Sequence, residues 1–433
     1  MAKVFPFQAW RYNLTKVGDA AQVMTQPYDK ISPEMQDRYY EHPYNLVRII
    51  LPKAYPDDDP RSNVYTRSLL TYRQWLAEGI FVQDEQPAFY VYYQHYRSPD
   101  GRERVRKGFI GLGQLEDYSA GIIYPHERTM MGPKLDRLKL LRLTRAHFES
   151  LFMLYRDPQH QIERLLDQHI EDKPALAVTD EYGVVHHLWA VTESSTLAQI
   201  QRLMDDKSLI IADGHHRYET ALAYRNERRE EGGTLGRWRS FHRAMMTFVN
   251  ADSDGLTILP THRVITSDVD FDLPRLLEFA KEHFTVEPVS SAEQLQSAMR
   301  NTSEQTVIGL YAAETNAFYL LRYLAQPGSL ALLSDVSARQ RHLDVSILHS
   351  LLLEHGLGIA PDDLAQRQLI RYVREFDVAI DMVKAGQGRA CFFLRPTTIE
   401  QVCDVALAGE VLPQKSTDFY PKLLSGLTIY RID

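Results

Sequence analysis

The sequence predicts a mixed α/β protein, and three observations lead to that fold class. The first part of the chain is rich in strand-like apolar runs, the middle part mixes strands with helices, and the last part alternates as β-α-β-α-β. Of the 433 residues, 44% are apolar and 24% are charged, which is typical of a globular protein. About 150 residues per domain gives two or three domains. We place three regions at residues 1–116, 117–250 and 251–433.

The first region, residues 1–116, is expected to be a strand-rich lobe with one good helix. Apolar residues run through 45–51 and 88–96, and the turn at Asp100 and Gly101 leads into a third strand over 107–115. Between them, residues 65–79 repeat at helical spacing until Gly79 ends the pattern. This helix is interpreted as core packing without chemistry.

The two later regions alternate helices and strands. In the middle region we expect helices at 135–147 and 159–171, a strand at 150–155, a hairpin at 175–191 and a strand at 208–212 that leads into a helix. In the last region we expect helices at 273–283, 292–299, 375–384 and 398–408, with strands at 306–312, 318–324, 368–373, 390–394 and 427–431.

Composition excludes several classes of protein. Cys391 and Cys403 are the only cysteines, so neither a disulfide framework nor a thiolate zinc cluster is expected. A formal charge of −8 opposes a nucleic acid partner. No uncharged apolar run reaches the ~18 residues of a membrane helix, and the first residues lack the apolar core of a signal peptide. We therefore expect a cytoplasmic protein without a membrane partner.

The most informative motif is an apolar strand that runs through Asp213 and Gly214 directly into a helix. His215, His216 and Arg217 stand at the start of that helix. The first helical turn leaves backbone N–H groups unpaired and carries a partial positive charge, so these side chains extend a site suited to phosphate or carboxylate. Asp213 would also serve as an ordinary helix cap. The added charge favours an anion-binding function.

Two further turns combine charge with a neighbouring helix or strand. One is His126-Glu127-Arg128, and the other is the segment 409–417, which contains Lys415, Ser416 and Thr417. If folding brings both turns to the anion-binding turn, the site contains the groups that phosphoryl transfer needs. Positive groups stabilise the charge of the phosphoryl group, and Glu127 acts as the base. Each residue taken alone also has an interpretation without chemistry. Glu127 would form an ion pair at the surface, and Lys415 would be an ordinary lysine of a loop.

The order of these motifs resembles the ADP-dependent free L-serine kinases of the ParB/sulfiredoxin-like superfamily. The likeness covers Pro125 to Glu127, Leu209 to Leu222, and a stretch from about Phe392 to Thr417. It implies transfer of a phosphoryl group to the hydroxyl of free L-serine, with magnesium on the donor phosphates. The implied site consists of the catalytic residues Glu127, Asp213 and His126, the phosphate-binding residues Gly214, His215, His216 and Arg217, and the substrate-binding residues Lys415, Ser416 and Thr417.

The same resemblance implies a ParB/sulfiredoxin-like catalytic core in residues 117–250. The strand-rich lobe and an inserted α/β region from about 251 to 365 would be additions to it. Where the kinases continue with Arg-His, this chain has Asp418-Phe419, so ADP, ATP and pyrophosphate all stay open as donors, and the oligomeric state is open as well. Nearly the whole chain also resembles a large bacterial family catalogued as domain of unknown function 1015, through segments such as Pro27 to Asp29, Tyr124 to Thr129, Leu259 to Arg263 and Phe419 to Leu424.

Two other function classes stay open. A metal-dependent phosphohydrolase would use His126, His215, His216 and Asp213 as ligands, since imidazole and carboxylate suit zinc or manganese. Adjacent histidines rarely reach the same ion, and no H-E-x-x-H spacing is present. The other alternative is a non-catalytic regulatory protein that binds a nucleotide.

Overall fold

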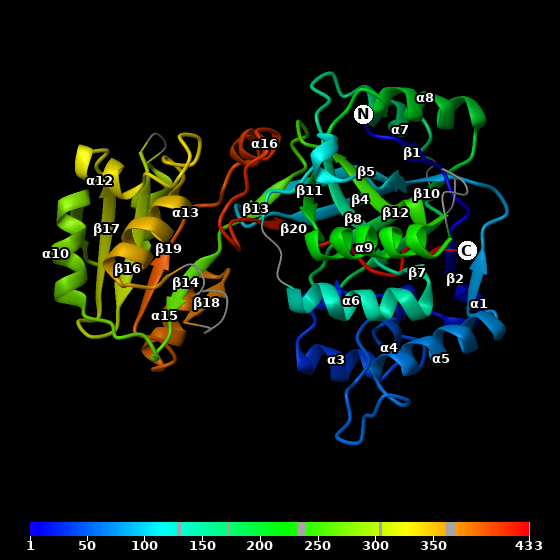
Figure 1. The fold of residues 1–433 in the computed structure, drawn as a ribbon, viewed down its shortest axis with the longest axis horizontal. Helices are drawn as coiled ribbons and strands as arrows, with labels where there is room; N and C mark the ends of the chain where they lie inside the picture. The colour runs from blue at the N-terminus through cyan, green and yellow to red at the C-terminus, as the bar shows by residue number, and fades with distance from the viewer. Residues whose placement is uncertain (128–130, 171–172, 233–239, 303–304, 361–368, 433) are drawn as a thin grey trace. The chain divides into compact units, whose positions relative to one another are not determined.

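The computed structural model describes residues 1–127, 131–170, 173–232, 240–302, 305–360 and 369–432 (Figure 1). The chain forms two compact units. Unit 1 consists of Met1–Pro125, Thr129–Thr257 and Pro421–Asp433, and unit 2 consists of His126–Arg128 and Ile258–Tyr420. Each unit combines sheets with helices, which confirms the mixed α/β class. The division into three regions stays a prediction.

The main sheet of unit 1 is mixed. Its described strands lie in the order β6-β11-β8-β12-β5-β4-β10-β9, and β1 pairs with β5. β11 is parallel to β6 and β12 is parallel to β8, whereas the other pairs are antiparallel. The strands are β1 (Val4–Phe5), β4 (Phe89–Arg97), β5 (Glu103–Gln114), β6 (Ile123–Tyr124), β8 (Leu151–Tyr155), β9 (Leu176–Thr179), β10 (Val185–Val191), β11 (Leu209–Asp213) and β12 (Arg243–Asn250).

Helices cover this sheet. Figure 1 shows α9 against the sheet with α6 beside it, and α3, α4 and α5 beyond α6. Two small sheets pair β2 (Trp10–Tyr12) with β3 (Phe81–Gln83) and β7 (Ala146–His147) with β21 (Tyr430–Arg431). The helices are α1 (Leu14–Val17), α2 (Ala20–Val23), η1 (Tyr28–Lys30), α3 (Pro33–Tyr40), α4 (Val47–Ile50), α5 (Val64–Ala77), η2 (Tyr118–Ala120), α6 (Met131–Thr144), α7 (Gln161–Asp167), α8 (Ser194–Met204), α9 (His215–Gly232) and η3 (Ser240–His242).

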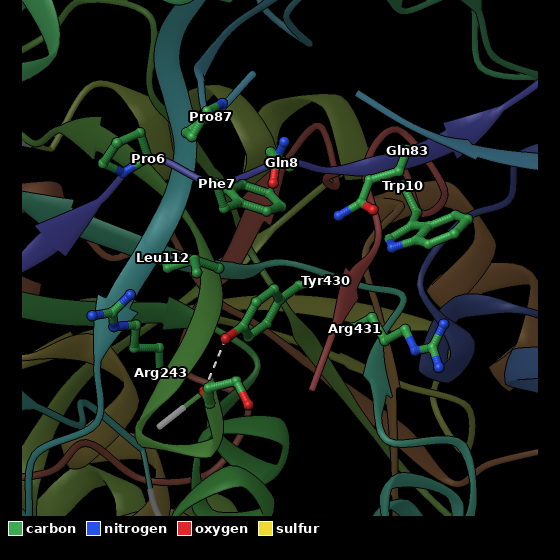
Figure 2. Close-up of a pocket in the computed structure, with 11 residues that line it drawn as sticks. Pro6, Phe7, Gln8, Trp10, Gln83, Pro87, Leu112, Arg243, Tyr430 and Arg431 are labelled. Carbon is green, nitrogen blue, oxygen red and sulfur yellow. Dashed lines mark hydrogen bonds between the residues drawn. The ribbon is translucent and has the colours of Figure 1, made fainter. Parts of the chain in front are cut away.

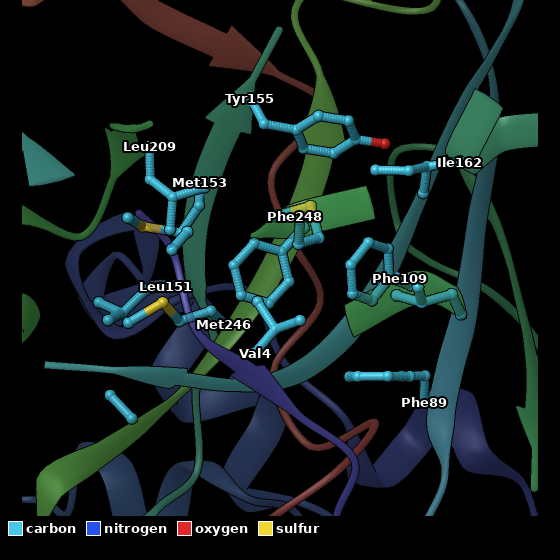
Figure 3. Packing of buried hydrophobic residues seen from close by; sticks show 14 of the residues in the cluster. Val4, Phe89, Phe109, Leu151, Met153, Tyr155, Ile162, Leu209, Met246 and Phe248 are labelled. Carbon is cyan, nitrogen blue, oxygen red and sulfur yellow. The ribbon is translucent and has the colours of Figure 1, made fainter. Parts of the chain in front are cut away.

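The core of unit 1 is built on aromatic side chains of the central strands (Figure 3). The rings of Phe109 and Phe248 stack with centroids 5.0 Å apart, and Phe89 meets Phe109 edge-on at 5.3 Å. All three are fully buried, and burial of one such side chain stabilises a fold by about 1.5–3 kcal/mol. Gly111 makes room for this packing, because a Cβ there would lie 2.7 Å from the Phe89 ring. The core thereby fixes β4, β5 and β12 at the centre of the sheet.

The prediction of a strand over residues 45–51 was wrong, because Val47–Ile50 forms helix α4. Asn45 lies two residues before the helix, where its side-chain Oδ1 accepts from the N–H of Val47 at 3.0 Å and its Nδ2 donates to the carbonyl of Gln22 at 2.7 Å. A short buried apolar run suits a strand or a helix equally well. The local turn role that Asn favours decides between them here.

Unit 2 contains an antiparallel sheet in the order β15-β17-β16-β19-β14-β18. Its core joins residues of this sheet, such as Val264 and Phe393, to Leu295 of α11 and Ile380 of α15. The strands are β13 (Thr257–Leu259), β14 (His262–Ile265), β15 (Phe284–Val289), β16 (Val307–Ala312), β17 (Ala317–Tyr323), β18 (Ile370–Val373), β19 (Ala390–Phe393) and β20 (Asp418–Tyr420), and the helices are α10 (Leu273–His283), α11 (Ala292–Arg300), α12 (Pro327–Leu332), α13 (Asp344–Ile347), η4 (Leu348–Gly356), α15 (Phe376–Lys384) and α16 (Ile399–Leu407).

The expected closing run is present as β18, α15, β19 and α16, but its final strand belongs elsewhere. β21 pairs with β7 in unit 1, through Tyr430 opposite His147 and Arg431 opposite Ala146. A strand of two residues gives no sequence signal of its partner. Among the described residues, no helix combines the length and the apolar character needed to cross a bilayer.

Candidate functional site

The predicted anion-binding turn connects β11 to α9 in unit 1. Asp213 ends the strand, and Gly214 follows with φ +93°. The N–H of Tyr218 donates to the carbonyl of Gly214 at 2.9 Å, which begins the helical hydrogen bonding. A Cβ on Gly214 would lie 3.1 Å from both the Arg217 guanidinium and the Leu151 side chain. Glycine is therefore required by the backbone and by the packing, and the positive end of the α9 dipole lies at this turn.

The carboxylate of Asp213 is surrounded by cations. Lys422 Nζ lies 3.0 Å from Asp213 Oδ2. Burial by itself would raise the pKa of Asp213, but the charges of Lys422, Arg217 and Lys30 outweigh it and hold that pKa well below its usual range. Asp213 is consequently an anion at every physiological pH, and it keeps the ammonium of Lys422 at the turn.

Arg217 is anchored on the segment that leads into β8. Its Nη1 donates to the carbonyl of Ser150 at 2.7 Å. Burial would lower the pKa of Arg217, yet the neighbouring carboxylates, Glu149 first among them, raise it. Glu149 is itself buried, which raises its pKa, and it accepts from the N–H of Tyr28 at 3.0 Å. The turn is thus tied to η1 through an ordered polar network.

Arg106 extends the positive charge beneath the turn. It is fully buried, its Nε donates to Gln94 Oε1 at 2.8 Å, and its guanidinium lies 4.7 Å from the centre of the Phe152 ring. Burial lowers the pKa of Arg106 to about 10, with Asp213 among the groups that oppose the shift. A pKa of about 10 still leaves the guanidinium charged at neutral pH. The residues around Asp213 therefore provide more positive than negative charge.

Unit 2 brings the other predicted residues together. Glu127 Oε1 accepts from the backbone N–H of Ser416 at 3.0 Å and of Thr417 at 3.4 Å. His126 Nε2 lies 2.6 Å from Thr417 Oγ1, and the carbonyl of His126 accepts from the N–H of Leu412 at 2.8 Å. Segments 289 residues apart in sequence are in direct contact. Arg128, the third residue of this motif, lies outside the described residues.

Hydrogen bonds to its backbone carbonyls hold the loop that contains Lys415 and Ser416. Arg263 donates to the carbonyl of Lys415 at 2.9 Å, and Thr397 Oγ1 donates to the carbonyl of Ser416 at 2.9 Å. Lys415 has φ +57°, a conformation that costs a non-glycine residue roughly 1 kcal/mol or more. Burial lowers the pKa of Arg263 to about 10, and Tyr372 and Glu127 oppose the shift. Arg263 therefore compensates for local strain with a charged hydrogen-bond donor.

The predicted residues thus form two clusters, each within one unit. Unit 1 holds Asp213, Gly214, His215, His216 and Arg217, whereas unit 2 holds His126, Glu127, Lys415, Ser416 and Thr417. The residues around them that were not predicted from the sequence are Lys422, Lys30, Arg106, Glu149, Arg263 and Thr397. The described residues contain no group of three or more His, Cys, Asp or Glu side chains arranged to hold a metal ion.

The missed residues had one detectable signal. Lys422 and Arg263 both lie in segments that resemble the family of unknown function, and Lys30 follows a third such segment. A comparison with known families tests this likeness directly. The model of the family described as "Protein of unknown function (DUF1015)" matches residues 4–346. The chain belongs to this family. No curated protein matches it.

The solved structures that are similar to this DUF1015 member are remote from it. A conserved hypothetical protein from Pyrococcus furiosus is 12% identical, with 71% of this chain and 91% of that chain covered and a TM-score of 0.35. A free serine kinase in complex with AMP is 12% identical, with 72% and 88% covered and a TM-score of 0.37. SbnI with a C-terminal truncation, from Staphylococcus aureus, is 11% identical, with 73% and 85% covered and a TM-score of 0.34.

Proposed function

We propose that this protein is a small-molecule kinase that transfers a phosphoryl group to the hydroxyl of free L-serine. The observation that carries the proposal is the cationic turn at the start of α9, where Lys30, Arg217 and Lys422 surround Asp213. Phosphoryl transfer is catalysed mainly by positioning and by positive groups around the phosphoryl oxygens. L-serine as acceptor follows from the ordered motif resemblance.

In this proposal the backbone amides at the start of α9 hold the transferring phosphate. Gly214 lets the backbone approach closely, because it carries no side chain. Arg217 and Lys422 supply side-chain charge, and Asp213 keeps Lys422 at the turn through the 3.0 Å ion pair. His215 and His216 are assigned to the same phosphate or to the nucleotide.

Glu127 is assigned as the general base. The two N–H groups of Ser416 and Thr417 fix the orientation of its carboxylate, as a base that must meet one hydroxyl proton requires. Lys415, Ser416 and Thr417 are assigned to the acceptor. We propose that this cluster and the Asp213 turn serve the same reaction.

The chemical step breaks the bond from the transferred phosphorus to the leaving oxygen of the donor and forms a bond to the serine hydroxyl oxygen. Glu127 takes the hydroxyl proton. Magnesium enters with the donor phosphates as part of the substrate. A resident metal does not fit at Asp213, because Lys422, Arg217 and Lys30 repel a cation there.

The test follows phosphoserine directly. Purified protein is incubated with L-serine, magnesium, and either ADP, ATP or pyrophosphate, and phosphorus NMR reports both the donor consumed and the product formed. We expect phosphoserine with at least one donor. Glu127→Gln should lower the rate about a hundredfold or more and leave donor binding unchanged, because the amide oxygen of Gln still accepts from Ser416 and Thr417. Absence of phosphoserine with every donor would overturn the proposal.

The same assay separates the other two classes. Release of phosphate that does not depend on serine indicates a phosphohydrolase. Donor binding without turnover, equal in wild type and Glu127→Gln, indicates a regulatory protein that binds a nucleotide.

A further inference from the structure

A pocket in unit 1, the aromatic pocket, shares no lining residue with the cluster around Asp213. It has a volume of about 700 Å³, within the range of small-molecule sites. Phe7 and Tyr430 form part of a buried floor, and Gln8, Gln83 and Arg431 form part of an exposed rim. The pocket therefore has buried aromatic rings at its base and is open to solvent at its rim.

The floor of this pocket is aromatic and held in place. The rings of Phe7 and Tyr430 meet edge-on with centroids 5.8 Å apart. Tyr430 donates its hydroxyl to the carbonyl of Ser240 at 2.9 Å, and the ring of His147 stacks behind it at 5.9 Å. Trp10 adds a half-buried indole to the wall (Figure 2). Fixed aromatic surfaces of this kind favour a flat, apolar ligand body.

Two arginines line the pocket. Figure 2 shows Arg243 and Arg431 on opposite sides of the Phe7 and Tyr430 rings. The guanidinium of Arg243 lies 3.8 Å from the centre of the Phe5 ring, which restricts its orientation. Among the described residues that line the pocket there is no Asp or Glu. Guanidinium groups make charge-assisted hydrogen bonds to carboxylate and phosphate groups, so these two side chains favour an anionic ligand.

We propose that this pocket binds a small organic anion in which a flat ring carries a carboxylate or a phosphate group. The ring occupies the aromatic floor, and the anionic group pairs with Arg431 or Arg243. The amides of Gln8 and Gln83 on the rim supply hydrogen bonds to polar edges of the ring. Both halves of such a ligand are needed for tight binding. The ring contacts only the aromatic floor, and the anionic group contacts only the arginines.

Titration calorimetry with four probes tests the proposal. AMP joins a ring to a phosphate, and indole-3-acetate joins a ring to a carboxylate. Adenosine and inorganic phosphate supply the ring and the charge separately. We expect at least one of the first two probes to bind with a Kd of about 1 mM or below, and about tenfold more tightly than adenosine or phosphate. The tighter of AMP and indole-3-acetate identifies the anionic group.

Variants assign the binding to this pocket. Arg431→Gln changes an exposed residue and should weaken the bound probe about tenfold, and Arg243→Gln should do the same while Arg243→Lys retains most of the affinity. Lys422→Met is the matched control, because it changes the Asp213 cluster and leaves this pocket intact. Binding that Lys422→Met abolishes and the arginine variants leave unchanged would overturn the proposal, as would equal affinity for whole ligands and their halves. Neither result bears on phosphoserine formation.

Discussion

The turn at Gly214 yields a quantitative prediction for Gly214→Ala. An alanine at φ +93° costs roughly 1–2 kcal/mol in backbone strain, and its Cβ would lie 3.1 Å from Arg217 and Leu151. Crowding of a packed site adds roughly 1–3 kcal/mol. We expect the free energy of unfolding to fall by about 3 kcal/mol, and donor binding to weaken because Arg217 is displaced.

Gly183→Ala is the matched control. Gly183 has φ +77°, and a Cβ there would meet no atom within 4 Å. Only the backbone strain of about 1–2 kcal/mol remains, and donor binding should not change. Urea denaturation followed by circular dichroism gives both free energies, and titration calorimetry gives the donor affinity. Equal destabilisation by the two alanines, or unchanged donor affinity in Gly214→Ala, would refute the argument from packing at the turn.

Three further predictions concern charge and hydrogen bonding. Lys422→Met removes the nearest cation of Asp213 and should lower the free energy of unfolding at pH 7 by about 3 kcal/mol. Lys422 acts against burial and holds the pKa of Asp213 below the ~3.9 of an unfolded chain. The loss of unfolding free energy in Lys422→Met should therefore reach its full size above about pH 4 and become smaller as the pH falls below about 4. Urea titrations at several pH values measure it. Glu127→Ala strips an acceptor from two backbone amides and should cost about 1–3 kcal/mol, whereas Glu127→Gln should cost much less in the same titrations. Burial lowers the pKa of His147 to about 4, so stability is lost as the pH falls from about 6.5 towards 4, and His147→Phe should flatten that part of the stability profile.

Local signals in the sequence were sufficient for the turn before α9. An apolar strand, a glycine and a helix adjoin one another there, so strand, turn and helix start were all predicted. The strand and helix types of most other elements followed from apolar spacing in the same way. Residues 45–51 failed, because a run of that length does not distinguish a strand from a helix until Asn45 binds Val47.

The partners across the fold were not predictable from any local pattern. Lys422 contacts Asp213 from 209 residues away, and nothing in the composition around Lys422 indicates that pairing. The contact of Glu127 with Ser416 and Thr417 was foreseen only through a family resemblance, since spacing along a chain does not determine which loops meet. Arg263 likewise stabilises a strained loop by donating to a backbone carbonyl. Every residue has such a carbonyl, so the sequence does not indicate which one Arg263 binds.

The segment Pro421–Ile432 has a consequence for how unit 1 is made in the cell. It supplies Lys422 to the Asp213 turn and Tyr430 to the aromatic pocket, yet the ribosome reaches it only after the whole of Ile258–Tyr420 has been synthesised. Until then the nascent unit 1 lacks the ammonium that pairs with Asp213 and the Tyr430 ring that packs against Phe7. Completion of unit 1 is therefore a late event of biogenesis, delayed by the translation time of an entire second unit.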